Sequence, residues 1–123
     1  MNHPLKNLVK NKKLFTQVVK RFGSPTYVYS KRQLIRNVSA INKALEANFK
    51  NFQICYTIKA NSNPHIIKVL KSEINHLGAD CSSPGEIYAA GLGGIHSNDC
   101  IFTGNYESKE DLKYAYDKNV HIN

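Results

Sequence analysis

The sequence repeats one order of segments: a short apolar strand, a capping residue and an amphipathic helix. The strand predicted at 52–59 is followed by Asn63-Pro64, which suits an N-cap and the first helical position. The strand predicted at 76–81 is followed by Ser83-Pro84-Gly85-Glu86, which has the form of a capping box. Strands and helices that alternate at this length predict right-handed βα units around a parallel sheet, and therefore an α/β fold.

Two further strands extend this pattern. A strand at 100–103 leads to a helix for which Ser108 is the predicted N-cap, and residues 120–123 have the composition of another strand. A parallel strand at the edge of a sheet needs a partner strand or a cover. We therefore expect the chain to form the front part of a longer α/β fold.

The segment before these units is predicted to contain two helices and a short strand. Apolar residues recur at helical spacing through 5–22, and Gly23 ends that helix. Residues 26–29 have the composition of a strand, and Ser30 to Gln33 fit a capping box that opens the second helix. The predicted apolar face of the second helix consists of Leu34, Ile35, Val38, Ile41, Leu45 and Phe49.

Lys59 ends an otherwise apolar run that is typical of a buried strand. Burial of an ammonium group is costly and commonly lowers its pKa, which leaves a neutral amine suited to Schiff-base chemistry with an aldehyde. The alternative is that Lys59 is simply the first solvated residue after the strand.

The alternation of side chains along each strand places Lys59 and Asp80 on equivalent faces. Lys59 shares its face with Cys55 and Thr57, whereas Asp80 shares its face with Gly78 and Ser82. In a barrel, inward residues at the carboxyl ends of the strands form the active site. Asp80 can then orient a cationic group or accept a hydrogen bond from a cofactor, or it can be satisfied by backbone donors of its own loop.

Other groups give weaker functional signals. Ser83 and Glu86 are explained by the capping box, and Gly91 to Gly94 follow a predicted helix, where they indicate a helix stop and not a phosphate loop. The histidines lack the spacing of metal ligands, so no metal site is predicted. The three cysteines, Cys55, Cys81 and Cys100, form no CxxC pair, which favours reduced thiols in a cytoplasmic protein.

Positive charge is concentrated at the start of the chain. The net charge is +8, and ten Lys and Arg residues precede Glu46, the first acidic residue. A polyanion-binding patch, a transit peptide and a solvated helix face are the alternatives, and we favour the solvated face because no nucleic-acid motif accompanies the charge. No apolar run approaches the roughly 18 residues of a membrane span, and no signal peptide is evident.

Three motifs, in the correct order, resemble one family of enzymes. Tyr56–Asn61 is similar to the Tyr-Ala-Val-Lys-Ala-Asn signature of the pyridoxal-phosphate-dependent diaminopimelate, ornithine and arginine decarboxylases, which have the alanine-racemase fold type. Gly78–Glu86 resembles the Gly-Ala-Asp-x-x-Ser-x-Gly-Glu stretch of that family, and Ile101–Asn105 resembles its following strand. Residues 26–29 resemble the segment that enters the barrel. The likeness extends from about Phe22 to Asn123 and is strongest to members that act on diaminopimelate.

The resemblance implies a fold, a cofactor and a reaction. The fold would be the N-terminal part of a (β/α)8 barrel, with about four of eight strands; we assign residues 1–24 to an N-terminal helix and turn and residues 25–123 to the barrel domain. Lys59 would bond to the aldehyde of pyridoxal 5'-phosphate, and Asp80 would lie in the cofactor pocket. The expected reaction is decarboxylation of an amino acid as a small-molecule substrate, meso-diaminopimelate to lysine, by cytoplasmic homodimers. Neither nucleic acid nor membrane is expected as a partner.

The chain departs from the family pattern in three respects. Pro84 replaces a more usual glycine, and Glu107 stands where many members have lysine, which leaves open another basic amino acid as the substrate. The family's phosphate site, the partner of its pyridine ring and its second domain would all lie beyond Asn123, so we expect the 123 residues alone to be inactive. A racemase is disfavoured by the Gly78–Glu86 stretch, and a vestigial or interaction fragment without catalysis is the remaining alternative.

Overall fold

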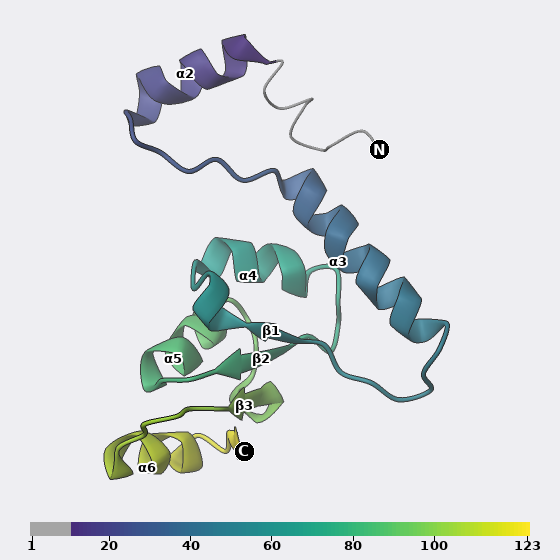
Figure 1. Ribbon diagram of the computed structural model, residues 1–123, viewed down its shortest axis with the longest axis vertical. Coiled ribbons are helices and arrows are strands. Elements are labelled where there is room, and N and C mark those ends of the chain that lie inside the picture. The colour runs from purple at the N-terminus through teal and green to yellow at the C-terminus, as the bar shows by residue number, and fades with distance from the viewer. Residues whose placement is uncertain (1–10) are drawn as a thin grey trace. The chain divides into compact units, whose positions relative to one another are not determined.

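The computed structural model describes residues 11–123 (Figure 1) and divides into two units, with the boundary between Gln33 and Leu34. In the first unit, helix α2 (Lys12–Phe22) begins at Asn11, whose side chain accepts a hydrogen bond from the Leu14 amide at 3.1 Å. Gly23 ends the helix with a φ of 81°, a value that favours glycine. The predicted helix is thus confirmed from Lys12 onward, and its residues 5–10 lie outside the described part of the chain.

The prediction of a strand at 26–29 is wrong. These residues have no strand assignment, and Tyr27 is 91% exposed. Valine and tyrosine favour extended backbone, but a strand also needs a neighbour with which to share hydrogen bonds, and no segment of the described chain pairs with this one.

Helix α3 (Lys31–Glu46) begins in the first unit and lies mostly in the second. The Ser30 hydroxyl accepts a hydrogen bond from the Gln33 amide at 3.3 Å, which confirms the predicted cap. Val38 is buried, but Ile41 and Phe49 of the predicted apolar face are 54% and 57% exposed. The helix therefore contacts the core through only part of that face.

A four-stranded parallel sheet in the order β1-β2-β3-β4 organises the second unit (Figure 1). The strands are β1 (Cys55–Thr57), β2 (Gly78–Cys81), β3 (Cys100–Phe102) and β4 (His121–Ile122). This confirms the predicted α/β fold and its four strands. The first strand is shorter than predicted, because the chain turns at Ile58 into the 3-10 helix η1 (Ile58–Ala60).

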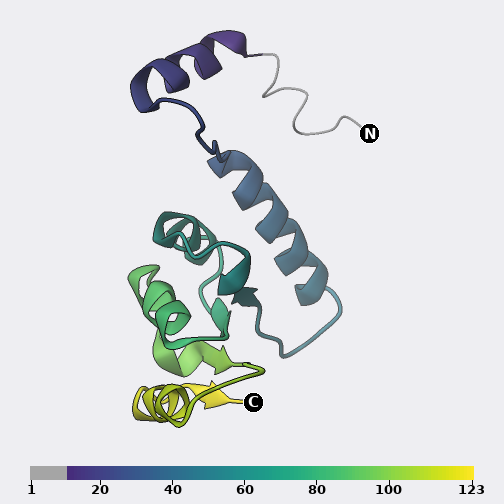
Figure 2. The ribbon, with the colours of Figure 1, turned by 60° about the vertical axis from the view of Figure 1, so that its left-hand side comes forward.

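Helices α4 (Pro64–Lys71), α5 (Pro84–Leu92) and α6 (Lys109–Asp117) connect successive strands and lie along one side of the sheet (Figure 2). A short 3-10 helix, η2 (Ser97–Asp99), precedes β3. The predicted N-caps are confirmed: the side chains of Asn63, Ser83 and Ser108 each accept a hydrogen bond from a backbone amide of their helix. Each strand is thus followed by a capped helix, as in a βα unit.

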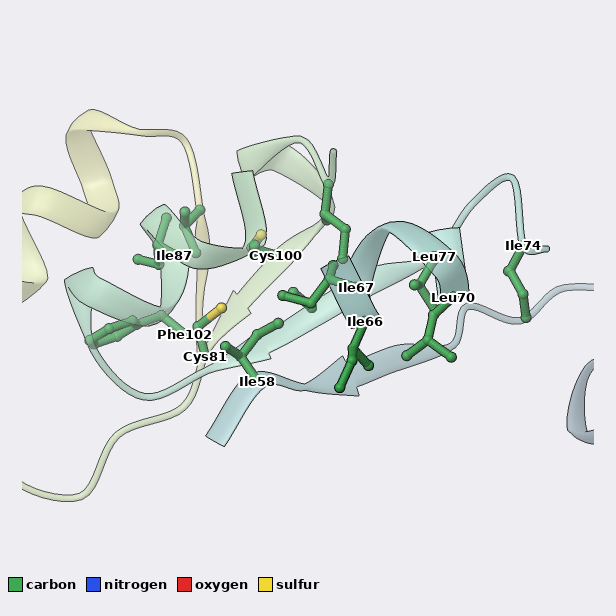
Figure 3. Close-up of a cluster of buried hydrophobic side chains, with 14 of the residues drawn as sticks. Ile58, Ile66, Ile67, Leu70, Ile74, Leu77, Cys81, Ile87, Cys100 and Phe102 are labelled. Atoms are coloured by element: carbon green, nitrogen blue, oxygen red, sulfur yellow. The ribbon is translucent and has the colours of Figure 1, made fainter. Parts of the chain in front are cut away.

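The core lies between the sheet and these helices (Figure 3). Ile58 of η1, Ile67 of α4 and Phe102 of β3 are each at most 1% exposed and point into one cluster (Figure 3). In β2, Ala79 and Cys81 face this core, whereas Asp80 faces away and is half-buried. The predicted alternation of faces along this strand is therefore confirmed.

A glycine contact sets how closely α5 approaches α4. Gly93 is the C-cap of α5, and a Cβ atom there would overlap the side chain of Ile67. Gly94 follows with a φ of 89° and turns the chain toward η2. The prediction that Gly91 to Gly94 stop a helix is confirmed. No helix within residues 11–123 is long and apolar enough to cross a membrane.

Candidate active site

The carboxyl ends of β1 and β2 bring the predicted site residues to one edge of the sheet. Lys59 lies in η1, directly after β1, and Asp80 lies in β2, the neighbouring strand. The η1 turn contacts β2 and α5. The structure therefore places Lys59 and Asp80 on adjacent strand ends, where active sites of parallel α/β folds form.

The side chain of Lys59 is exposed. It forms neither an ion pair nor a hydrogen bond with any residue in the described range 11–123. Of the two alternatives for Lys59, a buried lysine and the first solvated residue after the strand, the structure agrees with the second. Lys59 is an accessible primary amine.

The turn that carries Lys59 is anchored on both sides. Ile58, immediately before it, is fully buried in the core. The Tyr56 hydroxyl donates a hydrogen bond to the backbone carbonyl of Asn61 at 3.0 Å, which spans the turn. The Asn61 side chain in turn accepts from the Asn63 amide at 3.0 Å, just before α4. The backbone beneath Lys59 is thus fixed, although the side chain itself is free.

Asp80 has a partner that the sequence analysis did not single out. Thr57 and Asp80 are direct register partners in the parallel ladder, and the Thr57 hydroxyl donates to Asp80 Oδ2 at 3.1 Å. The hydrogen bond comes from a neighbouring strand and not from backbone donors of the Asp80 loop. Strand alternation placed Thr57 on the same face as Lys59, so a hydroxyl at that position was the available signal.

Cys55 lies two residues before Thr57 on β1, in register with Gly78. Burial, followed by the negative charge of Asp80, raises the pKa of the Cys55 thiol above its usual value. Cys55 and Thr57 alternate with Tyr56 along β1 and so lie on one face of the strand, where the Thr57 hydroxyl donates a hydrogen bond to Asp80. A Cβ atom at Gly78 would come within 2.9 Å of Cys55 Sγ, so the face has room only for glycine there.

Ser82 and Glu86 follow Asp80 but are engaged with each other. Glu86 Oε2 accepts from the Ser82 amide at 2.8 Å, and its carboxylate also accepts from the Ser82 hydroxyl. The Ser83 hydroxyl accepts from the Glu86 amide at 3.3 Å. These contacts start α5, which supports the structural interpretation of Ser83 and Glu86.

Lys59 and Asp80, at this edge of the sheet, fit the aldehyde and the basic ring of a cofactor that has both groups. Lys59 offers an unpaired amine for the aldehyde, and Asp80 offers a carboxylate oxygen, Oδ1, that accepts no hydrogen bond from the described residues. The loops after β1, β2 and β3, residues 58–63, 82–83 and 103–108, contain no Lys or Arg besides Lys59. They therefore offer no basic cluster for a phosphate. No group of three metal-ligating side chains occurs within residues 11–123.

A family model described as "Pyridoxal-dependent decarboxylase, pyridoxal binding domain" matches residues 31–123. The chain belongs to this family. The matched region contains the whole parallel sheet and both Lys59 and Asp80. The resemblance seen in the sequence motifs is thereby confirmed, as is pyridoxal as the cofactor that the decarboxylase domain binds.

Relatives in sequence and in structure agree with this assignment. The chain is 33% identical over 107 residues to the diaminopimelate decarboxylase of Thermoplasma acidophilum, covering 87% of the chain and 25% of that protein. It is 36% identical over 104 residues to the Aquifex aeolicus enzyme of the same name, covering 85% and 23%. The crystal structure of the Helicobacter pylori diaminopimelate decarboxylase, complexed with L-lysine, matches with a TM-score of 0.72 at 30% identity, covering 86% and 26%.

The chain spans about a quarter of the length of these relatives. Its four strands match the N-terminal part of the cofactor-binding barrel in the relatives' structures. This confirms the predicted fold class, namely a part of the barrel and not a complete one.

Proposed function

We propose that Lys59 is the lysine that bonds pyridoxal 5'-phosphate, in a protein that decarboxylates meso-diaminopimelate to lysine. The observation that carries the proposal is the exposed, unpaired amine of Lys59 at the carboxyl edge of a matched pyridoxal binding domain. The names of the relatives and the L-lysine in one related structure support this choice of substrate and product.

The two site residues have separate roles in this proposal. Lys59 holds the cofactor through its aldehyde carbon, because its amine is accessible and its backbone is fixed by Tyr56 and Ile58. Asp80 accepts a hydrogen bond from a donor on the bound ligand through Oδ1 and favours positive charge nearby. Bound pyridoxal phosphate supplies an electron sink for the electrons released when the carboxylate leaves as CO2.

Covalent labelling tests the role of Lys59. The purified protein is incubated with pyridoxal phosphate, reduced with borohydride and digested, and the labelled peptides are identified by mass spectrometry. We expect Lys59 to be labelled far more than Lys68, an exposed lysine on α4 that serves as an internal control. Lys59→Arg keeps the charge but removes the nucleophilic amine, and should abolish this selective label. Equal labelling of Lys59 and Lys68 would contradict the proposal.

Substrate choice is tested separately by CO2 release. In a full-length protein that contains these residues, we expect release from meso-diaminopimelate to exceed that from lysine, ornithine and arginine, and to fall to background in Lys59→Arg; the 123 residues alone are expected to release none. Faster release from another basic amino acid would replace the proposed substrate while leaving the role of Lys59 intact. Selective labelling of Lys59 without any CO2 release would support a cofactor-binding chain that lacks catalytic activity.

A further inference from the structure

The hydrogen bond between Thr57 and Asp80 joins the two strands of the site at their carboxyl ends. The two residues are register partners, with 3.1 Å between Thr57 Oγ1 and Asp80 Oδ2. Lys59 follows Thr57 by two positions, across the start of η1. Thr57 is therefore close to Lys59 along the chain and to Asp80 across the sheet.

We propose that Thr57 is a positioning residue that holds the Asp80 carboxylate in one orientation, with Oδ1 left available to a donor on the ligand at Lys59. This inference rests on the proposed function for the identity of that ligand. The signature of the family has alanine where this chain has Thr57. The hydroxyl is therefore a feature of this chain and not a requirement of the family.

The proposal rests on a difference in rotamer freedom between the side chains of Asp80 and Thr57. Asp80 is only half-buried, and Thr57 supplies the hydrogen bond that the described residues make to its carboxylate, so without that bond its side chain has space to change rotamer. Thr57 is branched at Cβ and stiff at χ1, and its backbone is held between Tyr56 and the fully buried Ile58. A hydrogen bond from a fixed hydroxyl to an ionised carboxylate therefore selects one orientation of the carboxylate.

The partner of Asp80 is a neutral hydroxyl and not the Lys59 side chain. Within residues 11–123 the Asp80 carboxylate pairs with the Thr57 hydroxyl, and no ion pair joins it to the Lys59 ammonium. Because Asp80 accepts its hydrogen bond from the neutral Thr57 hydroxyl, the Lys59 amine stays available to the aldehyde. Loss of the hydroxyl is expected to increase the mobility of Asp80 and to weaken the ligand's contact with it.

Three variants test this inference. Thr57→Val has nearly the same shape but no hydroxyl, and Thr57→Ser restores the hydroxyl without the methyl group. Thr103→Val is the matched control, because Thr103 is an exposed threonine at the end of β3 whose hydroxyl forms no hydrogen bond within the described residues. Urea unfolding of each variant verifies that the fold is retained.

The first measurement needs no cofactor. Three-bond NMR couplings to the carboxyl carbon of Asp80 report its χ1 rotamer. We expect one rotamer in the wild type, Thr57→Ser and Thr103→Val, and averaged couplings in Thr57→Val. Unchanged couplings in Thr57→Val would overturn the positioning role.

The second measurement is the dissociation constant of pyridoxal phosphate, followed by absorbance. We expect it to rise about two- to tenfold in Thr57→Val, the range for one lost hydrogen bond, and to stay near the wild-type value in Thr57→Ser and Thr103→Val. Averaged Asp80 couplings with unchanged affinity would show that Asp80 does not meet the ligand, and would overturn the inference. Failure of the wild type to label Lys59 selectively would instead refute the proposed function, and the couplings would still decide whether Thr57 orients Asp80.

Discussion

At the residue scale, the charge of Asp80 affects side chains on β1, the neighbouring strand. Its carboxylate accepts a hydrogen bond from the Thr57 hydroxyl. Its negative charge also raises the pKa of the Cys55 thiol, for which burial is the larger cause. Cys55 therefore reports the Asp80 charge in the protein without any ligand. Since a thiolate is the reactive form of cysteine, a raised pKa means less thiolate and slower alkylation at a given pH.

We predict that iodoacetamide alkylates Cys55 along a pH profile displaced above that of an unfolded cysteine peptide. Asp80→Asn removes the negative charge and should displace the profile back toward lower pH, so that alkylation at pH 8 becomes faster. Asp117→Asn is the control, because Asp117 is exposed on α6 and pairs with Lys113. Peptide mass spectrometry separates Cys55 from Cys81 and Cys100. A profile that does not change in Asp80→Asn would mean that burial and the other nearby groups, Cys100 and Asp99, control this thiol without Asp80.

At the scale of single elements, close approaches between helices depend on glycine. Gly93 ends α5 where a Cβ atom would overlap Ile67 of α4, whereas Gly91, inside α5, has open space around its Cβ position. These two glycines stand two residues apart and are expected to respond in opposite directions to the same substitution.

We predict that Gly93→Ala lowers the free energy of unfolding by about 1–3 kcal/mol, because Ile67 or α5 must shift. Gly91→Ala is expected to raise it by up to about 1 kcal/mol, because alanine favours the helix and meets no atom. Urea unfolding followed by circular dichroism measures both. A destabilising Gly91→Ala, or a neutral Gly93→Ala, would contradict the packing described for α4 and α5.

How well the sequence predicts the structure also differs from one element to the next. Alternation of side chains was sufficient to place Asp80 on the face away from the core, because Ala79 and Cys81 on either side of it face the core. Local composition did not predict the 3-10 turn at Ile58, which ends β1 two residues before the predicted end of the strand. The prediction of a strand at 26–29 was wrong because a strand needs a neighbouring strand with which to form hydrogen bonds, which local composition does not reveal. Thr57 was passed over because the register that joins it to Asp80 is a tertiary property.

At the scale of the whole molecule, one core joins the three βα units of residues 34–123. Phe102 of β3 is among its largest buried side chains, at 1% exposure, whereas Tyr106, four residues later, is 101% exposed. The two aromatic residues have similar size but opposite environments. Their removal therefore separates core packing from the loss of an aromatic ring as such.

We predict that Phe102→Ala lowers the free energy of unfolding by about 3–5 kcal/mol, since it leaves a cavity between the sheet and the helices. Tyr106→Ala should change it by no more than about 0.5 kcal/mol. Both values come from urea denaturation at fixed protein concentration. A comparable loss in the two variants would show that Tyr106 packs against a surface in solution.

The burial of Ile58 has a consequence for the motion of its neighbour. Ile58 is fully enclosed in the core, whereas Lys59 is exposed. Local opening of this turn would withdraw Ile58 from the core, so its free energy should approach that of global unfolding and exceed that of loop fraying. The amide hydrogens of the turn should then exchange slowly with solvent, while the four-carbon chain of Lys59 reorients on the picosecond-to-nanosecond timescale. The Lys59 amine can therefore sample many positions rapidly while its backbone stays fixed.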